Sequence, residues 1–595
     1  MAHDSLGDGM KDAGRRESEK LIETIGSSII GDDTVIDSPY GERRVTYADY
    51  TASGRSLTFI ERFIQDEVMP MYANTHTESS GTGLQTTRFR EDARQIIHDA
   101  VGGGDEDVVI FSGSGATSAI NKLVDVLNIR IPAGLDDRYH FIQQIPPEER
   151  PVVFIGPYEH HSNELPWRES IADVVTIDEN SDGQLDLAHL ERELKHYQDR
   201  PLKIGSFSAA SNVTGIGSKT GKTAILLHRY GALSFWDFAA AGPYVDIEMN
   251  MAGDLEDGDG ALAYKDAIFL SPHKFIGGPG TPGILVAKKH LFNNRVPAMP
   301  GGGTVSYVNS TEHRYLDCPI HREEGGTPDI VGAIRAGLVF QLKESVGHQA
   351  IRDAEQSFIQ RAIEQWSKHS NIQILGNPTS WRLSIVSFMI RDGERYLHHN
   401  FVVALLNDLF GIQARGGCSC AGPYGHRLLG IDLTTSQAFE QEVMQGCEGI
   451  KPGWTRLNFN YFISEETFAF LIEAVEIIAS EGWKLLPQYN FDPMTGQWKH
   501  REAEPKVRMR LHNLRYRSGH LSYPSRHMTA PEWVLPEYIV EAKQLLSEIR
   551  CIDEKNVQQA DLSERFNGLR WFVLPEEVCS RLSKTSEART AIEQV

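Results

Sequence analysis

Seven short apolar runs between residues 108 and 287 constrain the fold of this chain more than any other feature of its sequence. They are VVIF (108–111), VVFIG (152–156), VVTI (174–177), KIGSFS (203–208), LSFWDF (233–238), AIFL (267–270) and GILVA (283–287). Such runs are typical of strands that are buried on both faces. Because helix-length stretches separate several of them, the pattern predicts an α/β domain with a mostly parallel, seven-stranded sheet.

The remaining patterns divide the chain into four segments. After a glycine-rich stretch at 300–304, helical patterns at 329–345 and 349–368 lead to strands near 382–391 and 454–461, with helices near 398–409 and 465–481. This mixture is typical of a smaller α+β unit. We therefore expect a mobile polar leader followed by a short helix (1–40), a large α/β domain (41–305), interface helices with a small α+β domain (306–484), and a C-terminal extension (485–595).

Composition and charge disfavour several classes of protein. Acidic residues outnumber basic ones, 81 to 59, and the net charge of −22 disfavours binding to nucleic acid or to an anionic membrane. The basic stretch 506–520 alternates with apolar residues, as an exposed strand does. No apolar run approaches the roughly 20 residues of a membrane span, and the polar start has no apolar signal core. Six cysteines do not make a disulfide framework, so we expect a cytoplasmic protein with reduced thiols.

Lys274 lies in the sequence LSPHKFIGGPGTP, between an apolar run and several glycines. An amine at the end of a sheet strand can form a salt bridge, bind a phosphate or act as an imine-forming nucleophile. Lys274 alone does not separate these roles. The residues expected at the neighbouring strand ends distinguish between these three roles.

A Gly-Ser-Gly-Ala-Thr stretch, residues 113–117, lies between the first predicted strand and a predicted helix. Backbone N–H groups at such a helix start can hold a phosphate, although the glycines also suit a simple tight turn. The stretch lacks the third glycine and the acidic residue of a dinucleotide fingerprint. A phosphate site is therefore expected here in preference to a nicotinamide dinucleotide site.

Polar side chains follow three further predicted strands. Asp237 ends a buried strand, where a carboxylate needs a cationic partner such as the protonated ring nitrogen of pyridoxal phosphate. His160 could stack on a flat ring, and Asn212 could hydrogen-bond a phenolate-type oxygen; each would alone suit an ordinary loop. Because open α/β sheets bind ligands at this edge, the five groups together predict a pyridoxal phosphate site.

The order of these motifs resembles that of fold-type I pyridoxal phosphate enzymes of the class V aminotransferase group. Within it the chain is most similar to the cysteine desulfurase and selenocysteine lyase branch, over residues 45–482. The motifs that carry the resemblance are YADYTASG (47–54), NTH (74–76), GATSAIN (115–121), EHHSNELPW (159–167), SNVTG (211–215), DFAA (237–240), SPHKFIGGPG (271–280), EGGTP (324–328), RGGCSCAGP (415–423) and WTRLNF (454–459).

The resemblance implies a role for each cofactor-binding residue. Lys274 would attach the cofactor covalently, while Ser271, His273, Ala116 and Thr117 would bind its phosphate. His160 would stack on the ring, with Asn212 beside its oxygen and Asp237 on its nitrogen. Thr327 would reach the phosphate of a neighbouring subunit, which implies a homodimer, and no metal is expected.

The resemblance also implies a reaction. Arg456 would grip the α-carboxylate of an amino-acid substrate, with Arg415, Asn74 and His76 also contacting the substrate. Lys274 would remove the Cα proton, and His160 would lie over the reacting centre. The Cys420 thiolate would attack the sulfur of L-cysteine or the selenium of its analogue, which leaves a persulfide and alanine. The sulfur would then pass to an acceptor protein or a reductant.

Other interpretations stay open at this point. The chain could be a class V aminotransferase or an epimerase-like enzyme acting on another amino acid, or a non-catalytic binding module on the same scaffold. Ala240 stands where the family usually has a glutamine, and Cys418 could be a resolving partner for Cys420, part of a metal pair or a chance neighbour.

Overall fold

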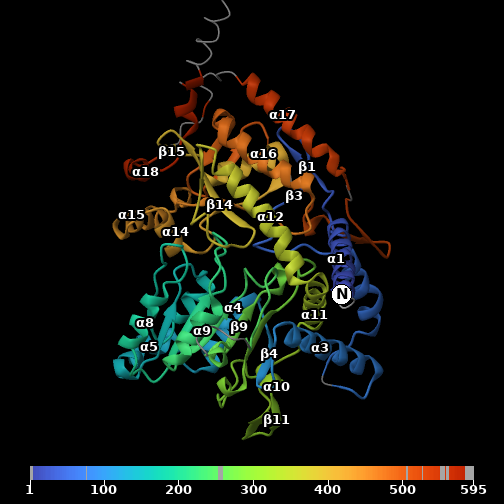
Figure 1. The fold of residues 1–595 in the computed structure, drawn as a ribbon, viewed down its shortest axis with the longest axis vertical. Coiled ribbons are helices and arrows are strands. Elements are labelled where there is room, and N and C mark those ends of the chain that lie inside the picture. Colours follow the sequence, from blue (N-terminus) through green and yellow to red (C-terminus); the bar gives the residue numbers. More distant parts are fainter. Residues whose placement is uncertain are drawn as a thin grey trace, which may run out of the picture.

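The computed structural model describes residues 4–75, 77–251, 259–503, 507–524, 527–549, 557, 562–579 and 581–582, with side chains described from residue 14 onward. Figure 1 shows two lobes, a lower one around the central sheet and an upper one formed mainly by the later part of the chain. The cavity that matters for function lies between residues of both lobes.

The central sheet has seven strands in the order β4-β10-β9-β8-β7-β5-β6. Their bounds are β4 Asp107–Ser112, β5 Val152–Ile155, β6 Asp173–Thr176, β7 Lys203–Ser208, β8 Leu233–Asp237, β9 Ala267–Leu270 and β10 Gly283–Lys288. Only β10 runs antiparallel to its neighbours. All seven predicted strands and the mostly parallel sheet of a fold-type I enzyme are therefore confirmed.

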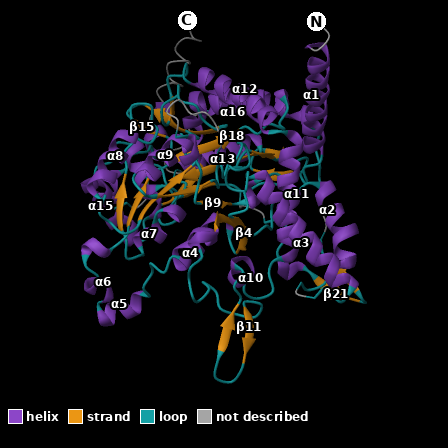
Figure 2. Cartoon of the chain, turned by 60° about the horizontal axis from the view of Figure 1, so that its bottom comes forward, coloured by secondary structure: helices purple, strands orange, loops and turns teal. Residues whose placement is uncertain are grey.

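Helices cover both faces of this sheet, because successive residues of each strand point to opposite sides. On one face Ile110 and Val153 pack with α4 (Gly115–Val126) and α7 (Leu165–Arg168). On the other face the adjacent strand residues pack with four helices, namely α3 (Gly81–Ala100), α8 (Leu187–His196), α9 (Thr220–Arg229) and α11 (Ile330–Val346). Figure 2 shows this layer of strands between helices.

The upper lobe contains a five-stranded antiparallel sheet in the order β13-β14-β18-β17, with β15 paired to β14. The strands are β13 Ile372–Ile374, β14 Ile385–Asp392, β15 Arg395–Tyr396, β17 Arg415–Gly417 and β18 Trp454–Asn458. The helices packed on it are α12 His348–Trp366, α13 His399–Phe410 and α16 Glu465–Glu481. The predicted α+β pattern of this region is thus present.

Segments from both ends of the chain join the upper lobe. The strand β3 (Thr46–Tyr47) pairs in parallel with β16 (Ile412–Gln413). Later residues enter the same apolar core as Phe401 of α13; they come from β19 (Tyr489–Asp492), β20 (Gln497–His500), α17 (Leu535–Glu548) and the segment around Phe572. The C-terminal segment therefore shares a core with the residues before it.

The N-terminal helix α1 covers Asp4–Ser27, 24 residues, so the short helix expected after a mobile leader is wrong in its length. The helix is long because its last turns are amphipathic. Ile25 is fully buried against the core of the central sheet, with Leu21 and Ile22 beside it.

The remaining elements are short. They include β1 Val35–Ser38, β2 Gly41–Arg44, α2 Thr58–Phe63, α5 Ala133–Tyr139, α6 Phe141–Gln144, β11 Val305–Val308, β12 His313–Tyr315, α10 Pro319–Glu323, α14 Gly422–Leu428, α15 Leu433–Met444, β21 Arg515–Arg517, β22 His520–Ser522 and α18 Glu564–Leu569. The β11–β12 hairpin projects away from the body at the bottom of Figure 2. Within the described ranges, no helix has both the length and the apolar character that crossing a bilayer requires.

Candidate active site

A cavity of about 240 Å³, partly open to solvent, lies at the carboxyl ends of the sheet strands. The central sheet and the start of α4 supply most of its walls, and the upper lobe adds four residues, Arg415, Ser419, Cys420 and Arg456. Eleven of the predicted site residues line it: Ala116, Thr117, His160, Asn212, Asp237, Ser271, His273, Lys274, Arg415, Cys420 and Arg456. The chain thus brings together groups that lie 340 positions apart in sequence.

Lys274 ends a single 3-10 turn, Pro272–Lys274, that directly follows β9. Burial lowers the pKa of its ammonium to about 8, and the nearby guanidiniums of Arg456 and Arg415 lower it too, while the Asp237 carboxylate opposes them. A lysine with such a pKa is partly uncharged near neutral pH. It is therefore a competent nucleophile for an aldehyde.

Asp237 is a buried carboxyl at the end of β8. Burial raises its pKa, while the backbone N–H of Ala239, which donates to Oδ1 at 2.8 Å, and the charge of Lys274 lower it. Lys274 is the cation that acts on its pKa, and no salt bridge to Asp237 occurs among the described residues. A cationic ring nitrogen in the cavity would supply the missing charge.

The loop before α4 forms a cradle next to β9. Gly115 has a φ of +54°, and a Cβ at this position would lie 2.9 Å from both Ser271 Oγ and His273 Cε1. The backbone N–H of Ala116 donates to Ser271 Oγ at 2.9 Å, so the hydroxyl proton of Ser271 remains available. Only glycine combines this backbone conformation with the close approach, which suits a phosphate at a helix start.

His160 lies at the mouth of the cavity and caps the short turn His161–Asn163. Its Nδ1 accepts from the backbone N–H of Ser162 at 3.1 Å. Burial lowers the pKa of His160 to about 3, with the charge of Lys274 as a further cause. The ring is therefore neutral at physiological pH, as stacking on a flat ring requires.

Ser162 is a residue that the sequence analysis missed. Its hydroxyl lies 2.7 Å from Thr117 Oγ1 and 3.0 Å from His160 Nδ1, so it connects the cradle to the stacking ring. It lies within the EHHSNELPW motif, and its position two residues after His160 was the available signal.

A buried carboxyl, Glu159, supports the floor of the cavity. It accepts from the backbone N–H groups of Gly156 and Ser208 at 3.2 and 2.9 Å, and from Asn163 Nδ2 at 2.6 Å. Burial raises the pKa of Glu159 to about 7. These bonds tie the ends of β5 and β7 together, next to the strand that carries Asp237.

Asn212 presents an unpaired oxygen to the site. Its Nδ2 donates to the carbonyl of Ser419 at 2.8 Å, whereas its buried Oδ1 has no hydrogen-bond partner among the described residues. An unsatisfied buried acceptor of this kind is costly unless a ligand donor meets it. The glycine cradle and the unpaired acid at Asp237 fit a flat, phosphorylated cofactor such as pyridoxal phosphate, and the Asn212 amide, turned over, would donate to its phenolate-type oxygen.

Asp49 organises the two arginines and was not predicted as a site residue. It accepts from Arg456 Nη2 at 2.9 Å and from Arg415 Nε at 3.0 Å. Arg456 is buried, and its Nη1 donates to the Asn212 carbonyl at 2.9 Å. The guanidinium of Arg415 is half-exposed and lines the cavity, so the pair can meet a carboxylate there.

Cys420 lies at the mouth of the cavity with an exposed side chain. Both Ser419 and Cys420 have a left-handed backbone, with φ values of +53° and +55°. The Cys420 carbonyl accepts from His161 N–H at 2.9 Å, and His161 Nε2 accepts from Gly422 N–H at 3.1 Å. This bonding holds the cysteine close to His160, whereas Cys418 is half-buried in an apolar cluster with Tyr424.

Two predicted residues are not brought to this cavity within one chain. Asn74 and Thr327 are exposed and do not line it, and His76 lies outside the described residues. Ala240 does line it, without a polar side chain. No group of three or more His, Cys, Asp or Glu side chains suited to a metal ion occurs in the described ranges.

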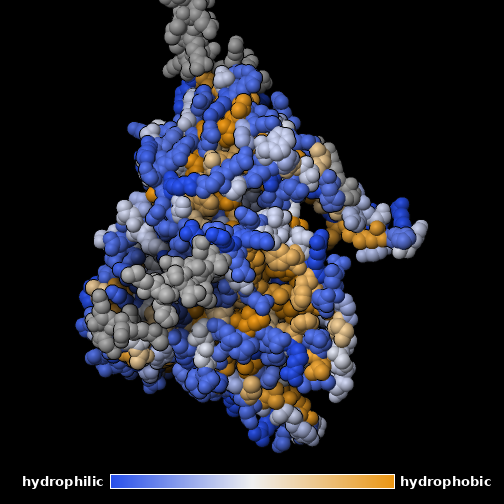
Figure 3. Space-filling model, turned by 45° about the vertical axis from the view of Figure 1, so that its right-hand side comes forward, coloured by the Kyte–Doolittle hydropathy of each residue, from blue (hydrophilic) through white to orange (hydrophobic). Residues whose placement is uncertain are grey.

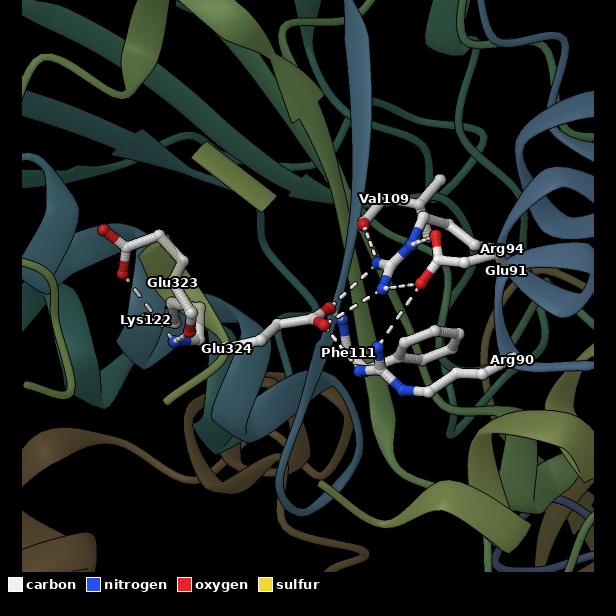
Figure 4. Close-up of polar contacts among 8 residues, drawn as sticks. All are labelled: Arg90, Glu91, Arg94, Val109, Phe111, Lys122, Glu323 and Glu324. Atoms are coloured by element: carbon white, nitrogen blue, oxygen red, sulfur yellow. Dashed lines mark hydrogen bonds and ion pairs between the residues drawn. The ribbon is translucent and has the colours of Figure 1, made fainter. Parts of the chain in front are cut away.

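The loop that carries Thr327 is fixed by two adjacent carboxylates (Figure 4). Glu324 accepts from Arg90 Nη2 at 2.5 Å, from Arg94 Nη1 at 2.9 Å and from the backbone N–H of Phe111 at 2.8 Å. Glu323 lies on the opposite side, near Lys122. The two arginines hold the pKa of Glu324 at about 2 in spite of its burial.

Comparison with known proteins agrees with this geometry. Residues 46–435 match the family model described as Aminotransferase class-V. The sequence is 25% identical over 417 residues to a "Probable cysteine desulfurase" of Staphylococcus aureus (strain COL), covering 69% of this chain and 92% of the relative. It is 25% identical over 416 residues to a "Probable cysteine desulfurase" of Staphylococcus epidermidis (strain ATCC 12228), covering 69% and 91%.

Solved structures show the same fold. An apo cysteine desulfurase from Thermococcus onnurineus NA1 superposes with a TM-score of 0.58 at 22% identity, covering 73% of this chain and 95% of that one. A cysteine desulfurase from Escherichia coli gives 0.54 at 20% identity, covering 73% and 94%. The family model spans well over half of the chain, so this protein belongs to the aminotransferase class-V family of pyridoxal phosphate-dependent enzymes.

Proposed function

We propose that the protein is a cysteine desulfurase-like enzyme that removes sulfur, or selenium, from an L-cysteine-type substrate and releases alanine. The observation that carries this proposal is the placement of Cys420. Its exposed thiol lies at the mouth of a cavity that also holds Lys274 and two arginines. The relatives named as probable cysteine desulfurases support the same activity class.

Pyridoxal phosphate, when bound, supplies an aldehyde for the amines and a ring that withdraws electrons from the substrate Cα. Lys274 would hold it, with His160 over the ring, Asn212 at its oxygen and Asp237 at its nitrogen. The cradle formed by Ala116, Thr117, Ser271 and His273 would bind the phosphate.

Different side chains of the protein would then bind the substrate, move its proton and attack its sulfur. Arg456 and Arg415 orient the substrate carboxylate, and the Lys274 amine takes the proton from Cα. The Cys420 thiolate attacks the substrate sulfur, so a Cys420–sulfur bond forms and the carbon–sulfur bond breaks. The electron pair of the broken bond stays with the side-chain carbon, which takes up a proton; Lys274 returns its proton to Cα to give alanine, and Cys420 keeps the persulfide.

The proposal includes a homodimer. Asn74, His76 and Thr327 would serve the cavity of a second copy, because Asn74 and Thr327 are exposed and do not line their own. Figure 3 shows that apolar surface gathers on one face, and the exposed Met69, Met71, Tyr72 and Leu84 flank Asn74 in sequence. Exposed apolar patches of this kind mark association surfaces.

We also propose a cytoplasmic location and delivery of the sulfur to an acceptor protein or a reductant. The cysteines Cys318, Cys418, Cys420 and Cys447 are free thiols, which suits a reducing compartment. Cys420 is exposed enough for an acceptor thiol to reach it.

The test is a product assay on the enzyme loaded with pyridoxal phosphate. With L-cysteine we expect alanine and a persulfide on Cys420, detected by mass spectrometry. Cys420→Ser should abolish both, while Cys418→Ser, two residues away, should retain them. A keto acid formed at an undiminished rate by Cys420→Ser would instead indicate an aminotransferase or an elimination reaction, and would contradict the proposal.

A further inference from the structure

The segment that carries Cys420 is packed against an imidazole with no space between them. The strand β17 runs directly into Cys418–Cys420, and His399, at the start of α13, lies against it. A Cβ at Gly416 would lie 3.0 Å from His399 Nδ1, and one at Gly453 would lie 2.7 Å from His399 Cδ2. The backbone that leads to the reactive cysteine therefore rests on this ring.

Trp571, from the C-terminal segment, covers the other side of the imidazoles. Its ring is stacked on His399, with centroids 5.7 Å apart at 25°, and on His398, with centroids 5.3 Å apart at 22°. The indole N–H donates to the carbonyl of Ile450 at 3.1 Å, which fixes the ring in its plane. Burial lowers the pKa of His399 to about 4, so the stacked imidazole is neutral at physiological pH.

Trp571 and the loop also share an apolar cluster. The cluster contains Ala421, Tyr424 and Trp454, and both Trp571 and Cys418 pack against it. Trp571 is thus linked to the Cys420 loop through His399 and through this cluster.

The segment that carries Trp571 is itself firmly attached. The backbone N–H of Tyr396 donates to the Trp571 carbonyl at 3.2 Å, and the N–H of Val573 donates to the Tyr396 carbonyl at 3.0 Å. Phe572 is fully buried in the upper core. Glu577, six residues on, pairs with Arg395 at 2.6 Å.

Position 571 lies beyond residues 46–435, so the family model does not account for it. We propose that Trp571 is a positioning residue, which acts through His399 to hold the Arg415–Cys420 segment in its reactive geometry. The inference rests on the proposed function for its catalytic consequence only. Its structural part, the fixing of the loop, is measurable without turnover.

The test compares Trp571→Ala and Trp571→Phe with Trp571 itself, and uses Trp533→Ala as a control because Trp533 is 63% exposed. Amide hydrogen exchange is followed in the peptide that spans residues 415–422 and in a reference peptide from β7. We expect Trp571→Ala to speed exchange in the first peptide by about tenfold or more, with the reference unchanged. Trp571→Phe, which keeps an aromatic ring, should restore most of the protection.

In the enzyme loaded with pyridoxal phosphate, Trp571→Ala should lower kcat for L-cysteine by about tenfold with little change in KM. Unchanged exchange at 415–422 in a folded Trp571→Ala protein would overturn the proposal. If that variant does not fold, Trp571→Leu is compared with Trp571→Phe. Equal exchange at 415–422 in these two variants would also overturn the proposal. If Trp571→Ala exchanges faster at 415–422 but the wild type has no desulfurase activity, the proposed function is refuted. The role of Trp571 in fixing the loop would still hold.

Discussion

Asp49 holds Arg456 through a 2.9 Å hydrogen bond between Oδ1 and Nη2, and its other oxygen binds Arg415 at 3.0 Å. Two positive charges at the cavity thus share one internal carboxylate, which fixes both guanidiniums before any substrate arrives. Fixed donors lose little freedom on binding, so this arrangement favours recognition of a substrate carboxylate.

Asp49→Asn should therefore lower kcat/KM. Charge-assisted hydrogen bonds are worth about 1.5–3 kcal/mol, so we expect kcat/KM for L-cysteine to fall by about tenfold or more. Steady-state kinetics measures this. Asp32→Asn, which breaks the pair with Arg44 away from the cavity, is the matched control and should leave kcat/KM unchanged. An unaltered kcat/KM in Asp49→Asn would refute the role given to Asp49.

The pKa of Lys274, lowered to about 8, predicts how the cofactor-free protein captures pyridoxal phosphate. Only the uncharged amine attacks an aldehyde, so the capture rate should rise with pH through about 8 and level off above it. Stopped-flow absorbance of the bound cofactor follows the rate. Asp237→Asn removes a charge that raises this pKa, so it should move the midpoint to lower pH. A midpoint near the ordinary lysine value would contradict the description of the site.

Glu324→Gln should destabilise the protein. The carboxylate is buried between Arg90 and Arg94, and removal of one partner of such a pair typically costs about 3–5 kcal/mol. Glu91→Gln is the control, because Glu91 meets the same arginines from a half-exposed position and should cost less than about 1 kcal/mol. Denaturant unfolding measures both, and an equal effect of the two changes would count against the account.

The pKa of Glu324 gives the same prediction a pH dependence. The native pKa is held at about 2, below its ordinary value, so the pair stabilises the protein fully above that ordinary value. This contribution is lost as pH falls toward 2. The difference in unfolding free energy between wild type and Glu324→Gln should therefore shrink on acidification.

The central sheet was predictable because its strands are buried on both faces, and such strands need a continuous run of apolar residues. VVIF became part of β4 and KIGSFS became β7. The length of α1 was not predictable in the same way. The start of the chain is polar in sequence, and the contacts of Ile25 with a core formed by distant residues anchor the last turns of the helix.

The gathering of most candidate residues in one cavity was likewise predictable, because several of them follow strands and parallel strands end at one edge. Asp237 and Lys274 are examples. Asp49 and Trp571 were not. Asp49 bonds Arg456, 407 positions away, and Trp571 stacks on His399, 172 positions away, and no local pattern marks a contact of that range.

The most direct test of the central claim is reductive trapping of the cofactor, followed by peptide mass mapping. The full-length protein is incubated with pyridoxal phosphate, reduced with borohydride and digested. The account predicts a pyridoxyl phosphate adduct on Lys274, its loss in Lys274→Ala, and an unchanged adduct in Lys222→Ala, where the lysine is exposed. A protein that carries no adduct, or carries it on another lysine, would contradict the account.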